Sequence, residues 1–345
     1  MAVGLRVAIA GCGAIAGGYD EASGFAHAYT HAGAVRRHPR FDLVAVAEPR
    51  EDRRAAFRKA WNVPVAHATV GAMLDQGPFD LLCICVPDAH HGSVVRLALE
   101  RGGARAILVE KPLAMTAEEA VALADRAADA GVSLYVNYNR RWDPLHERVR
   151  TWIADGGLGV LQGGIGHYVR GLRHNGTTMV QTLRRLLSRE VRSVRAIRSE
   201  PSSLDGDLAL DGVLEFSCGT AVWLQAADKA EYGHSVFEID LMGNRGRVRL
   251  HDNGYQVEVS QTAEYRRYPG FRELVRWPEL EATWPEGRMR ETLLATLDEV
   301  ADGLDRNVLS LSHARDACRD LRVVEALERS WRADGARCAP VVDSR

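Results

Sequence analysis

Glycines near the start of the chain have the spacing of a dinucleotide-binding turn. Gly11 and Gly13 begin the pattern G-x-G-x-x-x-G, and Ala16 stands where the third glycine of this fingerprint often lies, a position that also accepts alanine. Glycines allow a tight turn and let a pyrophosphate approach backbone N–H groups at the start of a helix. The pattern therefore predicts a phosphate-binding turn that includes Ala14 and Ile15.

An acidic residue stands where a ribose-binding carboxylate is expected. Glu48 directly follows the apolar run 41–47, and a carboxylate at the end of the second strand binds the ribose hydroxyls of NAD. Its charge would repel a 2′-phosphate, so the sequence favours NAD(H) over NADP(H). Arg50, Arg53 and Arg54 follow closely. They could accept a 2′-phosphate instead, or form a solvated helix face.

Two further segments follow the next apolar runs. The first, Val-Pro-Asp-Ala-His-His, contains Pro87 and His91, and the second, Glu-Lys-Pro, begins at Glu110. Parallel sheets bind ligands at the carboxyl ends of their strands, so we expect these residues on the cofactor side. His91 is expected to form hydrogen bonds there. It is not expected to bind a metal, because no carboxylate pair stands at ligand spacing.

Lys111 is the strongest candidate for a general acid and base. A lysine in a desolvated, cationic cleft can have its pKa lowered into the working range. The alternative is an exposed lysine at a strand end. The Glu-Lys-Pro setting favours the catalytic interpretation.

Alternating strand-like and helix-like segments must position these residues. The strand-like runs are rich in Val, Ile and Leu with little polar alternation, which is typical of strands covered on both faces. This order predicts an α/β fold with a doubly wound parallel Rossmann sheet. The expected strands are 5–10, 41–47, 79–86, 106–109 and 132–137, and the expected helices are 26–38, 51–61, 91–101 and 117–130.

The second half of the chain has a different pattern. Short strand-like segments separated by turn residues predict an α+β domain with one large, mainly antiparallel sheet. A length of 345 residues also favours two domains. The expected strands are 164–170, 191–199, 211–217, 220–225, 237–242 and 245–250.

With these motifs in place, the chain resembles the glucose–fructose oxidoreductase, inositol dehydrogenase and rhizopine-catabolism (Gfo/Idh/MocA) family. The Glu-Lys-Pro segment matches fully, and Val-Pro-Asp-x-x-His is close to the family's Thr-Pro-Asn-x-x-His. Residues 137–142, 237–250 and 313–331 continue the resemblance. It implies a Rossmann domain over 1–135 and a domain over 136–345 that binds substrate through an open sheet and forms subunit contacts. It also implies a last helix (313–331) packed toward the first domain, and a homodimer or homotetramer.

The chain departs from the family in one helix. The family carries Asp-x-Gly-x-His-x-x-Asp, whose histidine transfers a proton. Alignment on Gly176 puts Thr178 at that histidine and Gln181 at the second aspartate. Neither side chain can shuttle a proton near neutral pH. Tyr168 and His174 are therefore further catalytic candidates beside Lys111. A packing role for Tyr168 and a loop position for His174 are the alternatives.

The remaining candidates concern the substrate. The resemblance places Asn137 and Arg141 in the cleft. Arg170 could bind a phosphate or carboxylate. Thr178 and Gln181 can hydrogen-bond sugar hydroxyls, and we expect Asn175 beside them.

These features predict an NAD-dependent oxidoreductase that transfers a hydride to or from a secondary alcohol or ketone of a sugar, sugar nucleotide or cyclitol. Two alternatives stay open. One is elimination, epimerisation or isomerisation with tightly held NAD. The other is a non-catalytic cofactor-binding protein, which the replacements at Thr178 and Gln181 would suit.

Composition narrows the class of partner. A net charge of −2 argues against a broad nucleic-acid surface, and no apolar run is long enough to cross a bilayer. The N-terminus lacks the basic region of a signal peptide. The six cysteines are scattered, which favours free thiols in a cytoplasmic protein. We therefore expect a small-molecule substrate and no metal.

Overall fold

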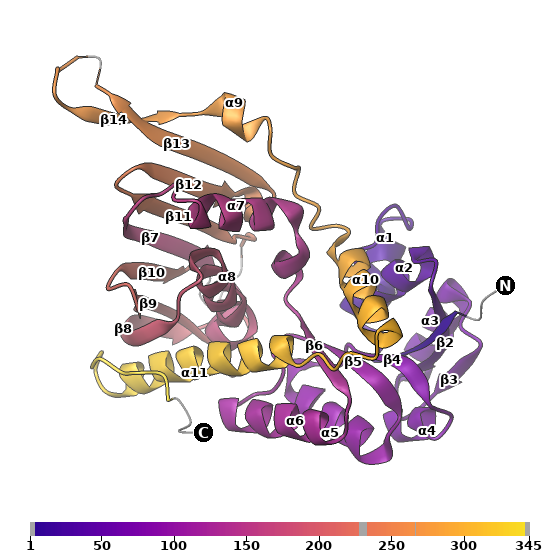
Figure 1. Ribbon diagram of the computed structural model, residues 1–345. Helices are drawn as coiled ribbons and strands as arrows, with labels where there is room; N and C mark the ends of the chain where they lie inside the picture. The colour runs from indigo at the N-terminus through magenta and orange to yellow at the C-terminus, as the bar shows by residue number, and fades with distance from the viewer. Residues whose placement is uncertain (1–3, 228–232, 266, 342–345) are drawn as a thin grey trace. The chain divides into compact units, whose positions relative to one another are not determined.

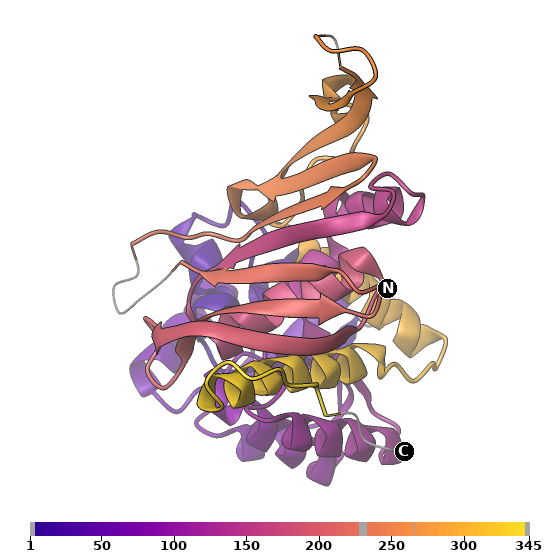
Figure 2. The ribbon, with the colours of Figure 1, turned by 90° about the vertical axis from the view of Figure 1, so that its left-hand side faces the viewer.

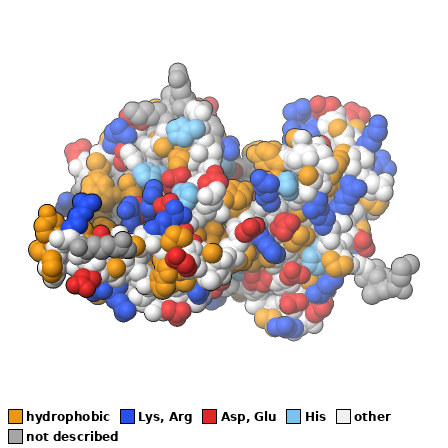
Figure 3. Space-filling view, turned by 90° about the horizontal axis from the view of Figure 1, so that it is seen from above, with side chains coloured by type: hydrophobic (Ala, Val, Ile, Leu, Met, Phe, Trp, Pro, Cys, Tyr) orange, Lys and Arg blue, Asp and Glu red, His pale blue; other side chains and the backbone are white. Residues whose placement is uncertain are grey.

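The computed structural model describes residues 4–227, 233–265 and 267–341. The chain divides into two compact units: Met1–Trp142 with Met289–Cys318, and Asp143–Arg288 with Arg319–Arg345. Within the described ranges, no helix is long and apolar enough to span a membrane. On the face seen in Figure 3, acidic and basic side chains are interspersed.

A six-stranded sheet forms the centre of the first unit (Figure 1). The strands are β1 (Leu5–Ala10), β2 (Phe41–Ala47), β3 (Val65–His67), β4 (Phe79–Ile84), β5 (Ala104–Glu110) and β6 (Ser133–Asn137). Their order is β3-β2-β1-β4-β5-β6, and every neighbouring pair is parallel. This confirms the predicted Rossmann sheet. The chain moves away from β1 in both directions, so the crevice for a ligand lies outside the carboxyl ends of β1 and β4.

The strands of this sheet are largely apolar, and helices cover the sheet. Residues 7–10 of β1 and 81–84 of β4 are fully buried, as expected when both faces are covered. On one face, α2, α3 and Leu297 of α10 pack on alternate strand residues such as Ile9 and Leu108. The helical segments of this unit are η1 (Ala14–Gly18), α1 (Tyr19–Ala22), α2 (His31–Arg37), α3 (Glu51–Trp61), α4 (Val70–Leu74), η2 (Asp88–His90), α5 (His91–Arg101), α6 (Ala117–Asp129), η3 (Asn139–Trp142) and α10 (Thr292–Asp305).

The predicted helix 26–38 is wrong at its start. The glycine turn leads directly into η1, a π-helical turn, and then into α1. The next helix begins only at His31, because the Thr30 side chain caps it by accepting from the Gly33 N–H. Asp20 fixes the preceding loop by accepting from the N–H groups of Tyr29 and Thr30. The short strand β3 was not predicted.

An eight-stranded sheet forms the centre of the second unit (Figure 2). Its order is β14-β13-β12-β11-β7-β10-β9-β8, and only the β10–β7 pair is parallel among the described strands. The mainly antiparallel prediction is thus confirmed. The strands are β7 (Leu161–Tyr168), β8 (Val191–Pro201), β9 (Leu208–Phe216), β10 (Ala221–Ala226), β11 (Glu238–Gly243), β12 (Gly246–His251), β13 (Gln256–Glu264) and β14 (Arg272–Arg276).

One face of this sheet carries the core of the second unit. Helices α7 and α8 and residues 323–327 of α11 pack on alternate strand residues such as Leu214 and Leu241. The opposite face leaves Trp223, Met242 and Ile197 exposed. The helical segments are α7 (Pro144–Ala154), η4 (Gly171–Gly176), α8 (Thr177–Leu187), η5 (Asp252–Gly254) and α9 (Pro278–Glu281). Helix α11 (Ser312–Arg332) belongs to the first unit up to Cys318 and to the second unit from Arg319.

Candidate functional site

The glycine turn leaves no room for a side chain at Gly11 or at Gly17. Gly11 has φ +89°, and a Cβ there would lie 2.7 Å from the carbonyl oxygen of Cys85. Its N–H donates to the carbonyl of Ala47. A Cβ at Gly17 would clash with Trp61 on α3. The bare backbone of this turn, followed by the helical turn η1, fits the pyrophosphate of a dinucleotide.

Glu48 lies beside that turn, immediately after β2. Its Oε2 accepts from the Cys12 N–H at 3.0 Å and its Oε1 accepts from the Arg50 N–H at 3.1 Å. A carboxylate has about four acceptor positions, so two remain for ribose hydroxyls. Nε of Arg53 donates to the Cys12 carbonyl, and Arg54 donates to the Glu48 carbonyl. These two guanidinium groups therefore bind the backbone around the carboxylate.

Glu110, at the end of β5, belongs to a buried polar cluster. Its Oε1 lies 2.8 Å from Nε2 of His31 and accepts from Nδ2 of Asn137 at 2.7 Å. Burial would raise the pKa of Glu110, but the hydrogen bond and charge of His31, with Asn137 and Lys111, lower it below its usual value. Oδ1 of Asn137 is buried and has no hydrogen-bond partner among the described residues.

Lys111 follows this cluster directly, at the carboxyl end of β5. The side chain is half-buried, and the Lys111–Pro112 peptide bond is cis. His91 is fully buried, with Nδ1 2.6 Å from the Pro112 carbonyl and Nε2 2.9 Å from the Val86 carbonyl. It thereby joins the segments after β4 and β5. Pro87 is exposed between them.

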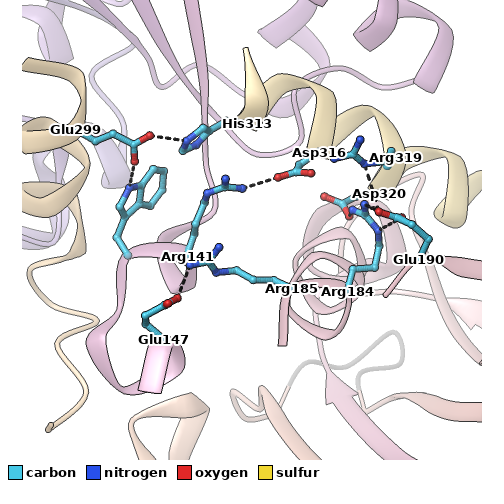
Figure 4. Close-up of polar contacts among 11 residues, drawn as sticks. Arg141, Glu147, Arg184, Arg185, Glu190, Glu299, His313, Asp316, Arg319 and Asp320 are labelled. Atoms are coloured by element: carbon cyan, nitrogen blue, oxygen red, sulfur yellow. Dashed lines mark hydrogen bonds and ion pairs between the residues drawn. The ribbon is translucent and has the colours of Figure 1, made fainter. Parts of the chain in front are cut away.

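Arg141 on η3 is paired within the first unit. Its NH1 lies 2.6 Å from Oδ2 of Asp316, and Figure 4 shows the two side chains pointing toward each other. In the same cluster, Glu299 accepts from Nε1 of Trp142 at 2.7 Å and lies 2.9 Å from Nε2 of His313. Burial opposes the charge of Glu299, but His313 and Trp142 lower its pKa to about 2.

Polar side chains on α8 form a separate group in the second unit. Oγ1 of Thr178 and Oε1 of Gln181 are buried and have no hydrogen-bond partner among the described residues. Buried polar atoms of this kind need a partner, and a bound ligand can supply it. The helix itself is held by Arg184, which pairs with Asp320 and Glu190 (Figure 4).

The segment before α8 presents the other predicted substrate residues. Arg170 has a left-handed backbone, with φ +63°, and Asn175 is half-buried. Asp207 accepts from the backbone N–H groups of Arg173 and His174. A Cβ at Gly171 would clash with Asp207, so the glycine is needed for this contact.

Tyr168 is fully buried. Its hydroxyl donates to the Leu210 carbonyl at 2.7 Å and accepts from the Leu210 N–H at 3.3 Å. An acid role would require these bonds to break.

The predicted residues fall into two sets. The first unit holds Gly11, Gly13, Ala14, Ile15, Glu48, Pro87, His91, Glu110, Lys111, Asn137 and Arg141, and the second holds Tyr168, Arg170, His174, Asn175, Thr178 and Gln181.

Comparison with known proteins decides the family. Residues 5–138 match the model of an oxidoreductase family with an NAD-binding Rossmann fold, and residues 134–336 match the C-terminal alpha/beta domain of the same family. The chain belongs to the GFO/IDH/MocA oxidoreductase family. The resemblance of the motifs is thus confirmed, and the first unit is the family's NAD-binding fold.

Individual family members are similar over part of their length. D-xylose 1-dehydrogenase (NADP(+)) 2 of Haloferax volcanii is 34% identical over 33% of this chain and 34% of its own. Scyllo-inositol 2-dehydrogenase (NAD(+)) of Bacillus subtilis is 26% identical over 61% of this chain and 66% of its own. The matched part thus spans less than two thirds of either relative. A solved NAD binding oxidoreductase from Klebsiella pneumoniae shares the fold, with TM-score 0.75, 18% identity and coverage of 99% and 100%.

His31 was missed by the sequence reasoning. It contacts Glu110, which lies 79 residues away in the sequence, and only the tertiary packing of α2 on the sheet brings the two residues together. The available signal was Thr30, a capping residue that marks the true start of α2.

Proposed function

We propose that the protein is an NAD-dependent oxidoreductase that transfers a hydride to or from a secondary alcohol or ketone of a sugar, sugar nucleotide or cyclitol. One observation carries the proposal. Lys111 follows β5, and in the same sheet the glycine turn follows β1 and Glu48 follows β2. A titratable amine and a dinucleotide cradle are thus built on carboxyl strand ends of one sheet.

The chain's own residues then have defined tasks. Bound NAD would supply the hydride acceptor, or NADH the donor. The carboxylate of Glu48 binds the adenosine ribose, and the backbone N–H groups around Gly13 and Ala14 face the phosphates. Nζ of Lys111 takes the proton of the substrate hydroxyl in oxidation and returns it to the carbonyl oxygen in reduction. The neutral Oδ1 of Asn137 accepts a hydrogen bond from the ligand.

The second unit supplies groups for substrate hydroxyls. Thr178 and Gln181 offer buried atoms that lack partners within the described residues, and hydroxyls can satisfy both. Arg170 and Asn175 precede them, and His174 remains a further candidate for proton transfer. The names of the xylose and inositol dehydrogenases support a polyol substrate.

Glu48 favours NAD over NADP, because a carboxylate directly after β2 would repel a 2′-phosphate. We further propose a homodimer or homotetramer in the cytoplasm. The exposed Trp223, Met242 and Ile197 on the open sheet face support subunit contacts. The buried thiols of Cys83 and Cys85 suit a reducing compartment.

The test is transfer of deuterium from C4-deuterated NADH to product, using ketoses, inososes and keto-sugar nucleotides. We expect label in one product, and a loss of about 10²–10⁴ in kcat for Lys111→Ala. Lys59→Ala, which removes an exposed lysine on α3, is the matched control. Label transfer at an unchanged rate in Lys111→Ala would refute its acid–base role. Product formation without net change of cofactor would favour the isomerase-type alternative.

A further inference from the structure

A buried pair of opposite charges lies directly before Lys111. Glu110 is 9% exposed and His31 is 2% exposed, and the two side chains meet at 2.8 Å. Asn137 donates to the same carboxylate oxygen. The three residues come from the end of β5, the first turn of α2 and the end of β6, so the contact is built by the packed core of the first unit.

The surroundings favour a charged His31. The titratable groups facing its ring are the thiols of Cys85 and Cys83, at the end of β4, and the carboxylate of Glu110. Asp20 lies near the start of the same helix, because its carboxylate accepts hydrogen bonds from the N–H groups of Tyr29 and Thr30. Burial disfavours the imidazolium, but hydrogen bonds and electrostatic interactions with Cys85 and Cys83 raise the pKa of His31 well above its usual value. The carboxylate of Glu110, 2.8 Å from Nε2 of His31, favours the same charged form.

The pair bears on Lys111 through Glu110. The ammonium of Lys111 and the carboxylate of Glu110 attract each other, which lowers the pKa of Glu110. Attraction is reciprocal, so an uncompensated carboxylate would hold Lys111 in its protonated form and make it a poor base. A positive charge on His31 opposes that field, since it lies in contact with the same carboxylate.

We propose that His31 is a positioning residue, which cancels the charge of Glu110 and thereby sets the pH at which Lys111 can give and take a proton. This inference rests on the proposed role of Lys111. His31→Gln separates charge from shape, because glutamine can still donate a hydrogen bond to Glu110 but carries no charge.

The direct test measures the amine of Lys111 without using turnover. The full-length protein is pulse-labelled with acetic anhydride from pH 6 to pH 11, and labelling of each lysine is read by mass spectrometry. The sequence has three lysines, at 59, 111 and 229. Lys59 therefore serves as an internal standard.

In His31→Gln we expect the labelling midpoint of Lys111 to rise by about one pH unit, which is about tenfold slower labelling below the midpoint. Lys59 should not change. In the double variant with Glu110→Gln, the Lys111 midpoint should return toward the wild-type value. His38→Gln is the control, because His38 binds the exposed Asp298 through the same ring atom.

An unchanged Lys111 midpoint in folded His31→Gln overturns the proposal. If that variant does not fold, the double variant is compared with Glu110→Gln alone. With no carboxylate present, the burial of His31 favours its uncharged form. Its loss should then no longer raise the midpoint, and a rise there would overturn the proposal. A shifted midpoint in a protein without NAD-dependent turnover supports the coupling and refutes the proposed function. If turnover exists and its pH profile stays fixed in His31→Gln, the inference alone fails.

Discussion

Nε2 of His31 lies 2.8 Å from Oε1 of Glu110 inside the first unit. Because its folded pKa is raised, the charge of His31 stabilises the fold fully below the unfolded pKa of about 6.5. This contribution is lost as the pH rises through the folded pKa.

His31→Gln should therefore reduce the free energy of unfolding most at pH 6 and progressively less at higher pH. Removal of one partner of a buried pair costs about 3–5 kcal/mol. Urea unfolding at a series of pH values, with His38→Gln as control, measures the difference. If the loss in free energy of unfolding grew with increasing pH, the assignment of a positive charge to His31 would be contradicted.

Gly11→Ala tests the dinucleotide turn. The new Cβ would meet the Cys85 carbonyl at 2.7 Å and would force a side chain into φ +89°. We expect a loss of about 2 kcal/mol or more in stability and a much weaker affinity for NAD.

Gly102→Ala is the matched control, since Gly102 also has a left-handed backbone, with φ +62°, but nothing lies within 4 Å of a Cβ there. It should cost only about 1 kcal/mol and leave NAD binding intact. Equal effects of the two changes on NAD affinity would refute the special role of the turn.

Two threonines on α8 offer a matched test of the substrate group. Oγ1 of Thr178 has no partner within the described residues, whereas Oγ1 of Thr182 donates to the Thr178 carbonyl at 2.8 Å. Thr178→Val should leave stability unchanged or raise it slightly, and it should raise the substrate KM. Thr182→Val should cost about 1 kcal/mol with little change in KM. Thermal unfolding and steady-state kinetics distinguish them. A large loss of stability in Thr178→Val with unchanged KM would show a structural role instead.

The sequence could predict those parts of the fold that follow from local pattern. Strands 5–10 and 41–47 have the predicted bounds because both are predominantly apolar runs whose last residues are buried. Helices 51–61 and 91–101 likewise have the predicted bounds. The start of α2 depends on the contact between Thr30 and Asp20, which no periodicity reveals. Strands β13 and β14 were missed because their residues are largely half-buried or exposed and mostly polar.

The candidate site divides in the same way. Glu48 and Glu110 could be placed at strand ends because each directly follows or closes an apolar run. Their partners could not, because the Cys12 N–H and the His31 ring reach them only through the packing of distant segments. The burial of Tyr168 against Leu210 is also a tertiary contact. From its position in a strand-like segment alone, Tyr168 could have either a catalytic role or a packing role.

The most direct test of the account is calorimetric titration of the cofactor-free protein with NAD, NADH, NADP and NADPH. We expect NAD and NADH to bind more tightly than the phosphorylated pair. Glu48→Ala should abolish that preference and weaken NAD binding by about tenfold or more, since it removes bonds to a ribose. Glu51→Ala, on the exposed start of α3, should bind as the wild type does. Absence of binding by all four nucleotides would contradict the central claim.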